Sequence, residues 1–288
     1  MDSTLASVQL IGIMLEIAVY GIYATLVPRA YSVLQKKDPG LLLIKYLRCF
    51  LIAKFLLTTL HVILGVGQVI YAFTTHTDQA GFAVIYLSRL NTVIVLLRTT
   101  CHSMVFALSD ILIVLRTYIL WERSLRVVAL PALLFVVELG HHAMFMVRIL
   151  TDNIDLARRN LIIVTVISWS LNLSSSGFLV YKIWKSRCIS TRSYFNTSIE
   201  HLSIAIIIVI ECALVYSLIA LALLIATALF SVAAVILILE LAVPLTGITF
   251  IYVTISSSNF QANAAIQQGP ATSNALGSNR NDRLGSAN

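Results

Sequence analysis

The sequence predicts an all-α membrane protein: a bundle of seven transmembrane helices with its N-terminus outside, its C-terminus in the cytosol and a disordered tail. Of the 288 residues, 59% are hydrophobic and only 11% are charged, and the mean hydropathy is +0.91. A soluble domain carries about 25% charged residues. Seven stretches supply the roughly 20 apolar residues that a helix needs to cross the bilayer. The chain has too little polar surface to face water all round, so it must face lipid.

The seven spans are expected to follow one another up to residue 255. We expect the first to end at Pro28, and residues 82–91 to lie at the interface before the third. No Gly, Pro or charge marks the turn between the last two, which we place near residues 227–230. Residues 256–288 are rich in Ser, Asn, Gln, Ala and Gly, a composition typical of disorder. The spans are approximately residues 5–27, 47–73, 95–121, 127–149, 161–184, 202–226 and 230–255, with a short charged loop at 151–160.

Basic residues set the expected orientation, because Lys and Arg are enriched in cytoplasmic loops. The loops after the first, third and fifth spans are rich in Lys and Arg, whereas the loop after the fourth carries Asp152 and Asp155 beside its arginines. This bias places the N-terminus outside, most simply in a plasma membrane. It also accounts for the net charge of +7, so the bilayer is the expected partner and nucleic acid is not.

Six sequence blocks carry a resemblance to a known family. They are YGIYATL in the first span, TTLHVILGVGQVIYAF in the second, SDILIVLRTYILWERSLRVVALPALLFV at the centre, FLVYKIWKSR, VIECALVYS and PLTGITFIYVTI. In order and spacing the chain resembles a large group of seven-helix membrane proteins from mushroom-forming (basidiomycete) fungi. The family has no established activity, so the resemblance implies the seven-helix fold and a receptor-like architecture, but no reaction.

Ionisable and polar side chains at membrane depth are the candidate functional residues, because their burial in lipid is costly. A polar cavity that binds a ligand or relays protons would use them. Interhelical bonds that only hold the bundle together, worth about 0.6 kcal/mol each, would use them as well. Among them Lys54 is expected to pair with Asp110 or Glu211. The candidates are Glu16, Lys54, His61, Asp110, Glu138, Glu211, Tyr216 and Glu240.

A second set of candidates lies at the cytosolic ends of the third and fifth spans. These positions could contact a cytosolic signalling partner. A snorkelling Arg within an aromatic belt is the structural alternative. The candidates are Arg116, Tyr118, Arg123, Arg126, Lys185 and Arg187.

Several familiar chemistries do not fit. Residues 230–255 contain no Lys for a retinal Schiff base, and the loop at 151–160 contains no Cys for the usual receptor disulfide. His141 and His142 are adjacent, so they point about 100° apart on a helix and do not share a face; His61 and His102 would have to supply the remaining ligands of a zinc site. Walker A, GxSxG and dinucleotide motifs are missing from the sequence. We therefore expect no catalytic residues, no resident metal and no cofactor.

Four functions remain open from the sequence. The leading one is an orphan receptor-like protein that senses a small apolar or amphipathic ligand within the bundle. A proton-coupled carrier would use the intramembrane carboxylates, although carriers often contain internal repeats and none is visible here. An intramembrane hydrolase and a purely structural membrane protein are the further alternatives.

Overall fold

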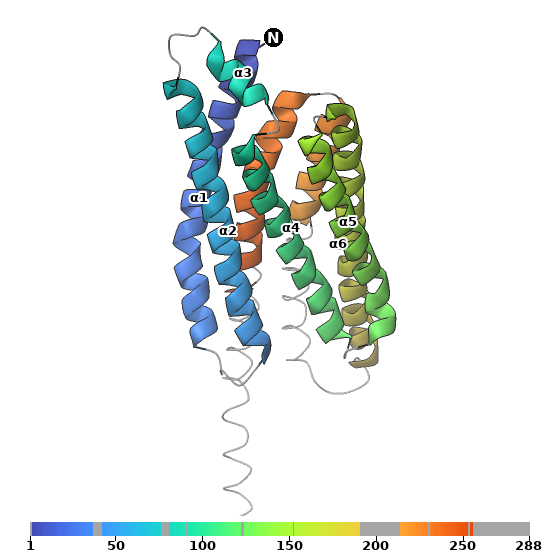
Figure 1. Ribbon diagram of the computed structural model, residues 1–288. Helices are drawn as coiled ribbons and strands as arrows, with labels where there is room; N and C mark the ends of the chain where they lie inside the picture. Colours follow the sequence, from blue (N-terminus) through green and yellow to red (C-terminus); the bar gives the residue numbers. More distant parts are fainter. Residues whose placement is uncertain are drawn as a thin grey trace, which may run out of the picture.

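The structure is a computed structural model that describes residues 2–36, 42–75, 81–89, 92–121, 124–151, 153–190, 214–229, 231–252 and 254–255. Every regular element in these ranges is a helix, and the long helices stand side by side as one bundle (Figure 1). The elements are α1 (Asp2–Gln35), α2 (Leu42–Thr74), α3 (Phe82–Ser88), α4 (Val93–Leu120), α5 (Leu125–Leu150) and α6 (Ile154–Ser190), followed by helices at Leu214–Ala228 and Val232–Tyr252.

Six of the described helices are long and apolar enough to cross a membrane: α1, α2, α4, α5, α6 and Val232–Tyr252. The chain is thus an integral multi-pass membrane protein. The helix Leu214–Ala228 is apolar but shorter, and residues 202–213 of the predicted sixth span lie outside the described residues. The predicted tail, 256–288, lies outside them too. α3 has only seven residues and lies across the N-terminal end of the bundle (Figure 1).

Burial in this bundle is reversed relative to a soluble protein. Glu16 and Asp110 are 0% exposed, whereas Met14 is 64% exposed and Leu133 is 62% exposed. Apolar side chains on the outside suit lipid, and charged side chains on the inside avoid it. The membrane assignment therefore rests on the distribution of side chains as well as on helix length.

Two expected helix limits are wrong. α1 does not end at Pro28 but continues to Gln35; proline is tolerated within membrane helices because neighbouring groups satisfy the freed backbone. The charged loop expected at 151–160 is mostly helical, because α6 begins at Ile154. Asn153 explains that start, since its side-chain oxygen accepts the backbone N–H of Leu156 at 3.3 Å as an N-cap does.

The packing order brings the last helix against the first. α2 lies between α1 and α4, and α4 also contacts α5 and α6. The largest apolar core joins four helices through Tyr23, Leu51, Leu112 and Ile251. The chain breaks its helix between Ala228 and Val232, so the final helix runs back along α1 and carries Glu240 to the middle of the bundle.

Candidate functional site

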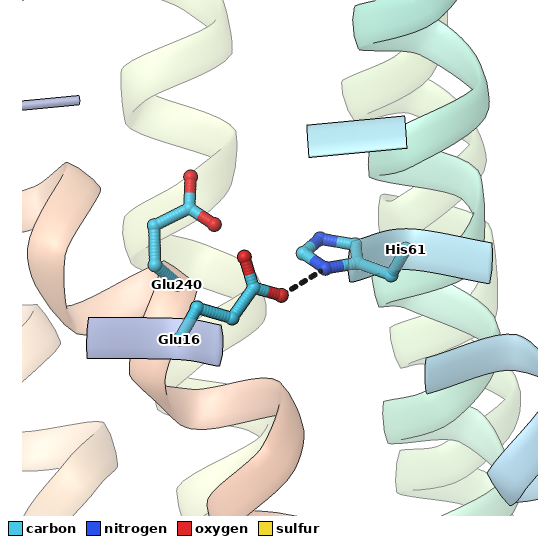
Figure 2. Close-up of side chains that lie close together, drawn as sticks. All are labelled: Glu16, His61 and Glu240. Atoms are coloured by element: carbon cyan, nitrogen blue, oxygen red, sulfur yellow. Dashed lines mark hydrogen bonds and ion pairs between the residues drawn. The ribbon is translucent and has the colours of Figure 1, made fainter. Parts of the chain in front are cut away.

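Four charged or titratable side chains from four helices meet inside the bundle, and we call them the Arg98 cluster: Glu16 on α1, His61 on α2, Arg98 on α4 and Glu240 on the last helix. Glu16 Oε1 lies 2.7 Å from His61 Nδ1, and Glu16 Oε2 accepts from Arg98 Nη2 at 2.9 Å. The same Nη2 donates to Glu240 Oε2. Figure 2 shows Glu16 lying between His61 and Glu240. One guanidinium nitrogen thus bridges two carboxylates.

Two glycines make room for this cluster. A Cβ atom at Gly12 on α1 would lie 3.3 Å from Cγ of Glu240, and a Cβ atom at Gly65 on α2 would lie 2.8 Å from Nη2 of Arg98. Real Cβ atoms essentially never approach as closely as the second value. The guanidinium therefore rests against the backbone of α2 at the one residue type that permits it.

Three members of the cluster could also hold a metal ion. Glu16, His61 and Glu240 each offer one ligand atom, and these atoms lie within 4.8 Å of one another. Two carboxylates and an imidazole are suitable ligands for a divalent transition metal. Arg98 already supplies a positive charge at the same carboxylates, so a metal would have to share them with the guanidinium.

A cavity of about 440 Å³ lies above this cluster, at the end of the bundle where the N-terminus lies. His61, Arg98, His102 and Glu240 form its floor, and its walls come from α1 to α6 and both C-terminal helices. The remaining lining residues are Gln9, Gln68, Leu87, Val95, Thr99, Ser103, His142, Phe145, Ile149, Asp155, Ala157, Arg158, Leu161, Val164, Ala226, Thr227, Ser231, Val232, Val235, Ile236 and Leu239.

A second polar group, which we call the Asp110 cluster, contains Lys54, Asp110, Glu138 and Tyr216. Both oxygens of Asp110 and Oε2 of Glu138 have no hydrogen-bond partner among the described residues. The charges of Lys54 and Glu138 both act on Asp110. No member of this cluster lines the cavity. Lys54 and Asp110 therefore share a neighbourhood, whereas the expected direct pair between them remains a prediction and Glu211 lies outside the described residues.

Lys54 has well-formed contacts of its own. Its ammonium donates to Ser109 Oγ at 2.7 Å and to the carbonyl oxygen of Thr246 at 3.0 Å, and lies 5.4 Å from the ring centroid of Phe250. These contacts tie α2 to α4 and to the last helix. This is the arrangement expected of a buried cation that holds helices together.

Aromatic contacts connect the two clusters. The ring centroids of His61 and His102 lie 6.0 Å apart, His102 stacks on Phe106 at 4.7 Å, and Phe106 lies 6.1 Å from Tyr216. Tyr216 shares a 2.6 Å hydrogen bond with Ser168 on α6. Because Arg98, His102, Phe106 and Asp110 recur at intervals of four, one face of α4 contributes to both clusters.

The candidates for cytosolic contact lie at the opposite end of the bundle. Tyr118 is partly buried, whereas Arg126 and Lys185 are exposed. Near them Trp121 donates its indole N–H to the carbonyl oxygen of Phe178 at 3.3 Å and stacks on Tyr181, as an aromatic belt does. Arg123 and the side chains of Arg116 and Arg187 lie outside the described part.

Arg98 is the site residue that was missing from our candidate list. Its signal was present in the sequence: an Arg within an apolar span, four residues before His102. An arginine at membrane depth requires a partner, and two carboxylates elsewhere were already candidates. Their convergence could not be read from the sequence, because it depends on how α1 and the last helix pack against α4.

Comparisons of the chain with protein families, with curated proteins and with solved structures find no match. What this protein does must therefore be argued from its own geometry. Two features carry that argument: a cavity with a charged floor, and a second polar cluster beneath it.

Proposed function

We propose that this chain is a receptor-like protein of a plasma membrane, which senses a small apolar or amphipathic ligand within its helix bundle. The observation that carries the proposal is the cavity of about 440 Å³ above the Arg98 cluster. Ligand sites typically measure about 300–1,000 Å³ and combine an apolar wall with a few polar groups. Here most of the wall is apolar, and Arg98 and Glu240 lie together at the floor.

The proposed orientation places the cavity toward the outside. Among the described residues the opposite end of the bundle carries Arg29, Lys36, Arg48, Arg126 and Lys185, and basic loops face the cytosol. We further propose that residues 202–213 extend the helix Leu214–Ala228 into a seventh span. The resemblance to the seven-helix family of mushroom-forming fungi supports that count. A cytosolic partner would then meet the exposed Arg126 and Lys185.

Photolabelling tests the proposal. The purified full chain in lipid nanodiscs is irradiated with a diazirine-bearing octanol, and labelled peptides are mapped by mass spectrometry. Labelling of cavity-lining peptides that excess octanol suppresses is the expected result. Val235→Trp, which fills the cavity from the last helix, should abolish it. Val137→Trp should not, because Val137 is an exposed residue on α5. Cavity labelling that excess octanol does not suppress would refute ligand binding here.

A proton-coupled carrier is the second candidate, and the Asp110 cluster is the observation that favours it. Asp110 and Glu138 lie buried near one another, and three of their four carboxylate oxygens have no hydrogen-bond partner among the described residues. Such groups are typical of proton pathways. Proteoliposomes with an internal pH dye provide the test. A carrier acidifies or alkalinises them when substrate is added, and Asp110→Asn abolishes the change.

A further inference from the structure

We propose that the ligand of the cavity carries one positive charge at one end, as an amphipathic amine does, and that Glu240 receives it. This inference rests on the proposed function and specifies its ligand class. It follows from the charge of the Arg98 cluster, from the accessibility of each member, and from two polar side chains that line the cavity and make no hydrogen bond with another described residue.

The charges of the Arg98 cluster do not balance. Glu16 and Glu240 contribute two negative charges and Arg98 one positive charge, so one negative charge is in excess when His61 is neutral. A net charge buried away from water costs several kcal/mol. The cluster is therefore completed by one further positive charge, either a proton or a cationic group that enters from the cavity.

The other charged groups around the cavity do not supply it. On α6, Asp155 and Arg158 both line the cavity and carry opposite charges, so together they add no net charge. On α5, His142 lines the wall. Its Nε2 lies 3.8 Å from Oε1 of Glu138 on the same helix, and its Nδ1 lies 3.3 Å from Ser103 Oγ on α4. The excess negative charge thus remains at the floor.

The members of the cluster differ in what they can offer a ligand. Glu240 lines the cavity, whereas Glu16 does not and is 0% exposed. Nη2 of Arg98 is committed to the two carboxylates, and its Nε is buried. Arg98 also lines the cavity, but the excess negative charge of the cluster disfavours an anionic head group there. A cationic head group meets the carboxylate of Glu240 directly.

Two polar side chains that line the cavity point to a hydrogen-bonding ligand. Gln68 is only 4% exposed, lines the cavity and makes no hydrogen bond with another described residue. His102 lines the floor and likewise makes none within the described part. A neutral imidazole can accept from an ammonium. Gln68 follows His61 by two helical turns, roughly 10 Å along α2, so it would serve a second polar group nearer the mouth.

Competition between matched head groups tests the inference in the same photolabelling assay. Octylamine, octanol and octanoate share one chain, so their relative protection of cavity peptides reports the head group. In the wild type octylamine should protect at a concentration at least about tenfold below that of octanol, the factor for one charge-assisted hydrogen bond, and octanoate should protect least. Glu240→Gln should remove the advantage of the amine and keep protection by octanol.

The test compares the ratio of octylamine protection to octanol protection between the wild type and each variant. Because the probes partition into lipid equally in both samples, their different partitioning cancels. Asp155→Asn removes the other carboxylate that lines the cavity and should reduce the advantage of the amine less than Glu240→Gln does. An amine advantage that persists in Glu240→Gln overturns the inference, as does protection by octanoate equal to that by octylamine in the wild type. Protection by zinc chloride that octylamine cannot match would assign the cluster to a metal and also overturn it. The proposed function fails separately, if octanol itself gives no saturable protection.

Discussion

Replacing Gly65 by Ala should displace Arg98 without disturbing the rest of α2. The new Cβ atom would lie 2.8 Å from Nη2, 2.9 Å from Cζ and 3.0 Å from Nε, whereas ordinary contacts begin at 3.4 Å. The guanidinium lies at the end of a flexible side chain and can move by several tenths of an ångström. Because Nη2 is bonded to both Glu16 and Glu240, that movement weakens both ion pairs.

The expected magnitude follows from two opposing effects. Overpacking a well-packed site costs about 1–3 kcal/mol, and Ala in place of Gly within a helix returns up to about 1 kcal/mol. Gly67→Ala provides the matched control on the same helix, since a Cβ atom there meets nothing within 4 Å. The free energy of unfolding of Gly65→Ala should therefore be lower than that of Gly67→Ala by about 1–3 kcal/mol.

Reversible unfolding of the purified protein in mixed micelles measures this difference, and the photolabelling assay measures its effect on the cavity. We expect Gly65→Ala to lose stability and part of the advantage of octylamine over octanol, and Gly67→Ala to keep both. Equal unfolding free energies for the two variants would show that Arg98 does not rest against Gly65. The geometry of the Arg98 cluster would then be wrong, and the proposals built on it would fail together.

Two further substitutions test the packing around the site. Gly247→Ala would place a Cβ atom 2.6 Å from the ring of Tyr23, which is 0% exposed and cannot move aside. We expect the free energy of unfolding to fall by about 3 kcal/mol, the upper end for overpacking, in the same unfolding assay. A fall below about 1 kcal/mol, well short of that overpacking cost, would contradict this packing. Arg48→Gln should lower the free energy of unfolding by about 1.5 kcal/mol, because Arg48 donates to the carbonyl oxygen of Leu34, near the end of α1, at 2.7 Å and 3.2 Å and charged hydrogen bonds contribute about this much. Arg29→Gln, at an exposed position of α1, should cost less than about 0.5 kcal/mol. Equal losses for the two variants would show that Arg48 does not stabilise the end of α1.

The membrane character and the helical fold could be predicted from the sequence, because both depend on local composition. Long apolar runs specify the helices whatever their neighbours do. The limits of the helices were harder to predict where two local signals in the sequence conflict. Pro28 suggested an end to α1, yet the helix passes through it. The charges after residue 151 suggested a loop, yet Asn153 starts a helix there.

The candidate site could be predicted only as a set of unusual residues. The free-energy cost of burying an ionisable side chain in lipid was enough to identify Glu16, His61 and Glu240 as candidates. It could not show that they converge while Lys54 lies with Asp110, because the distance between helices is a property of packing. Arg98 was not among the candidates, because its depth in the bilayer was inferred from the limits of the predicted span. Composition locates those limits only to within one helical turn.

The Arg98 cluster differs from the contacts of Lys54 in a way that supports the proposed ligand site. Polar groups that only hold helices together are hydrogen-bonded to one another. Lys54 shows this pattern, because it donates to groups on two neighbouring helices. The Arg98 cluster is equally well connected on one side but borders a cavity on the other. Stability alone gives no reason for charged groups to border a void, since a void forfeits packing contacts. The proposed function gives the charges at the cavity floor a reason that assembly of the bundle does not.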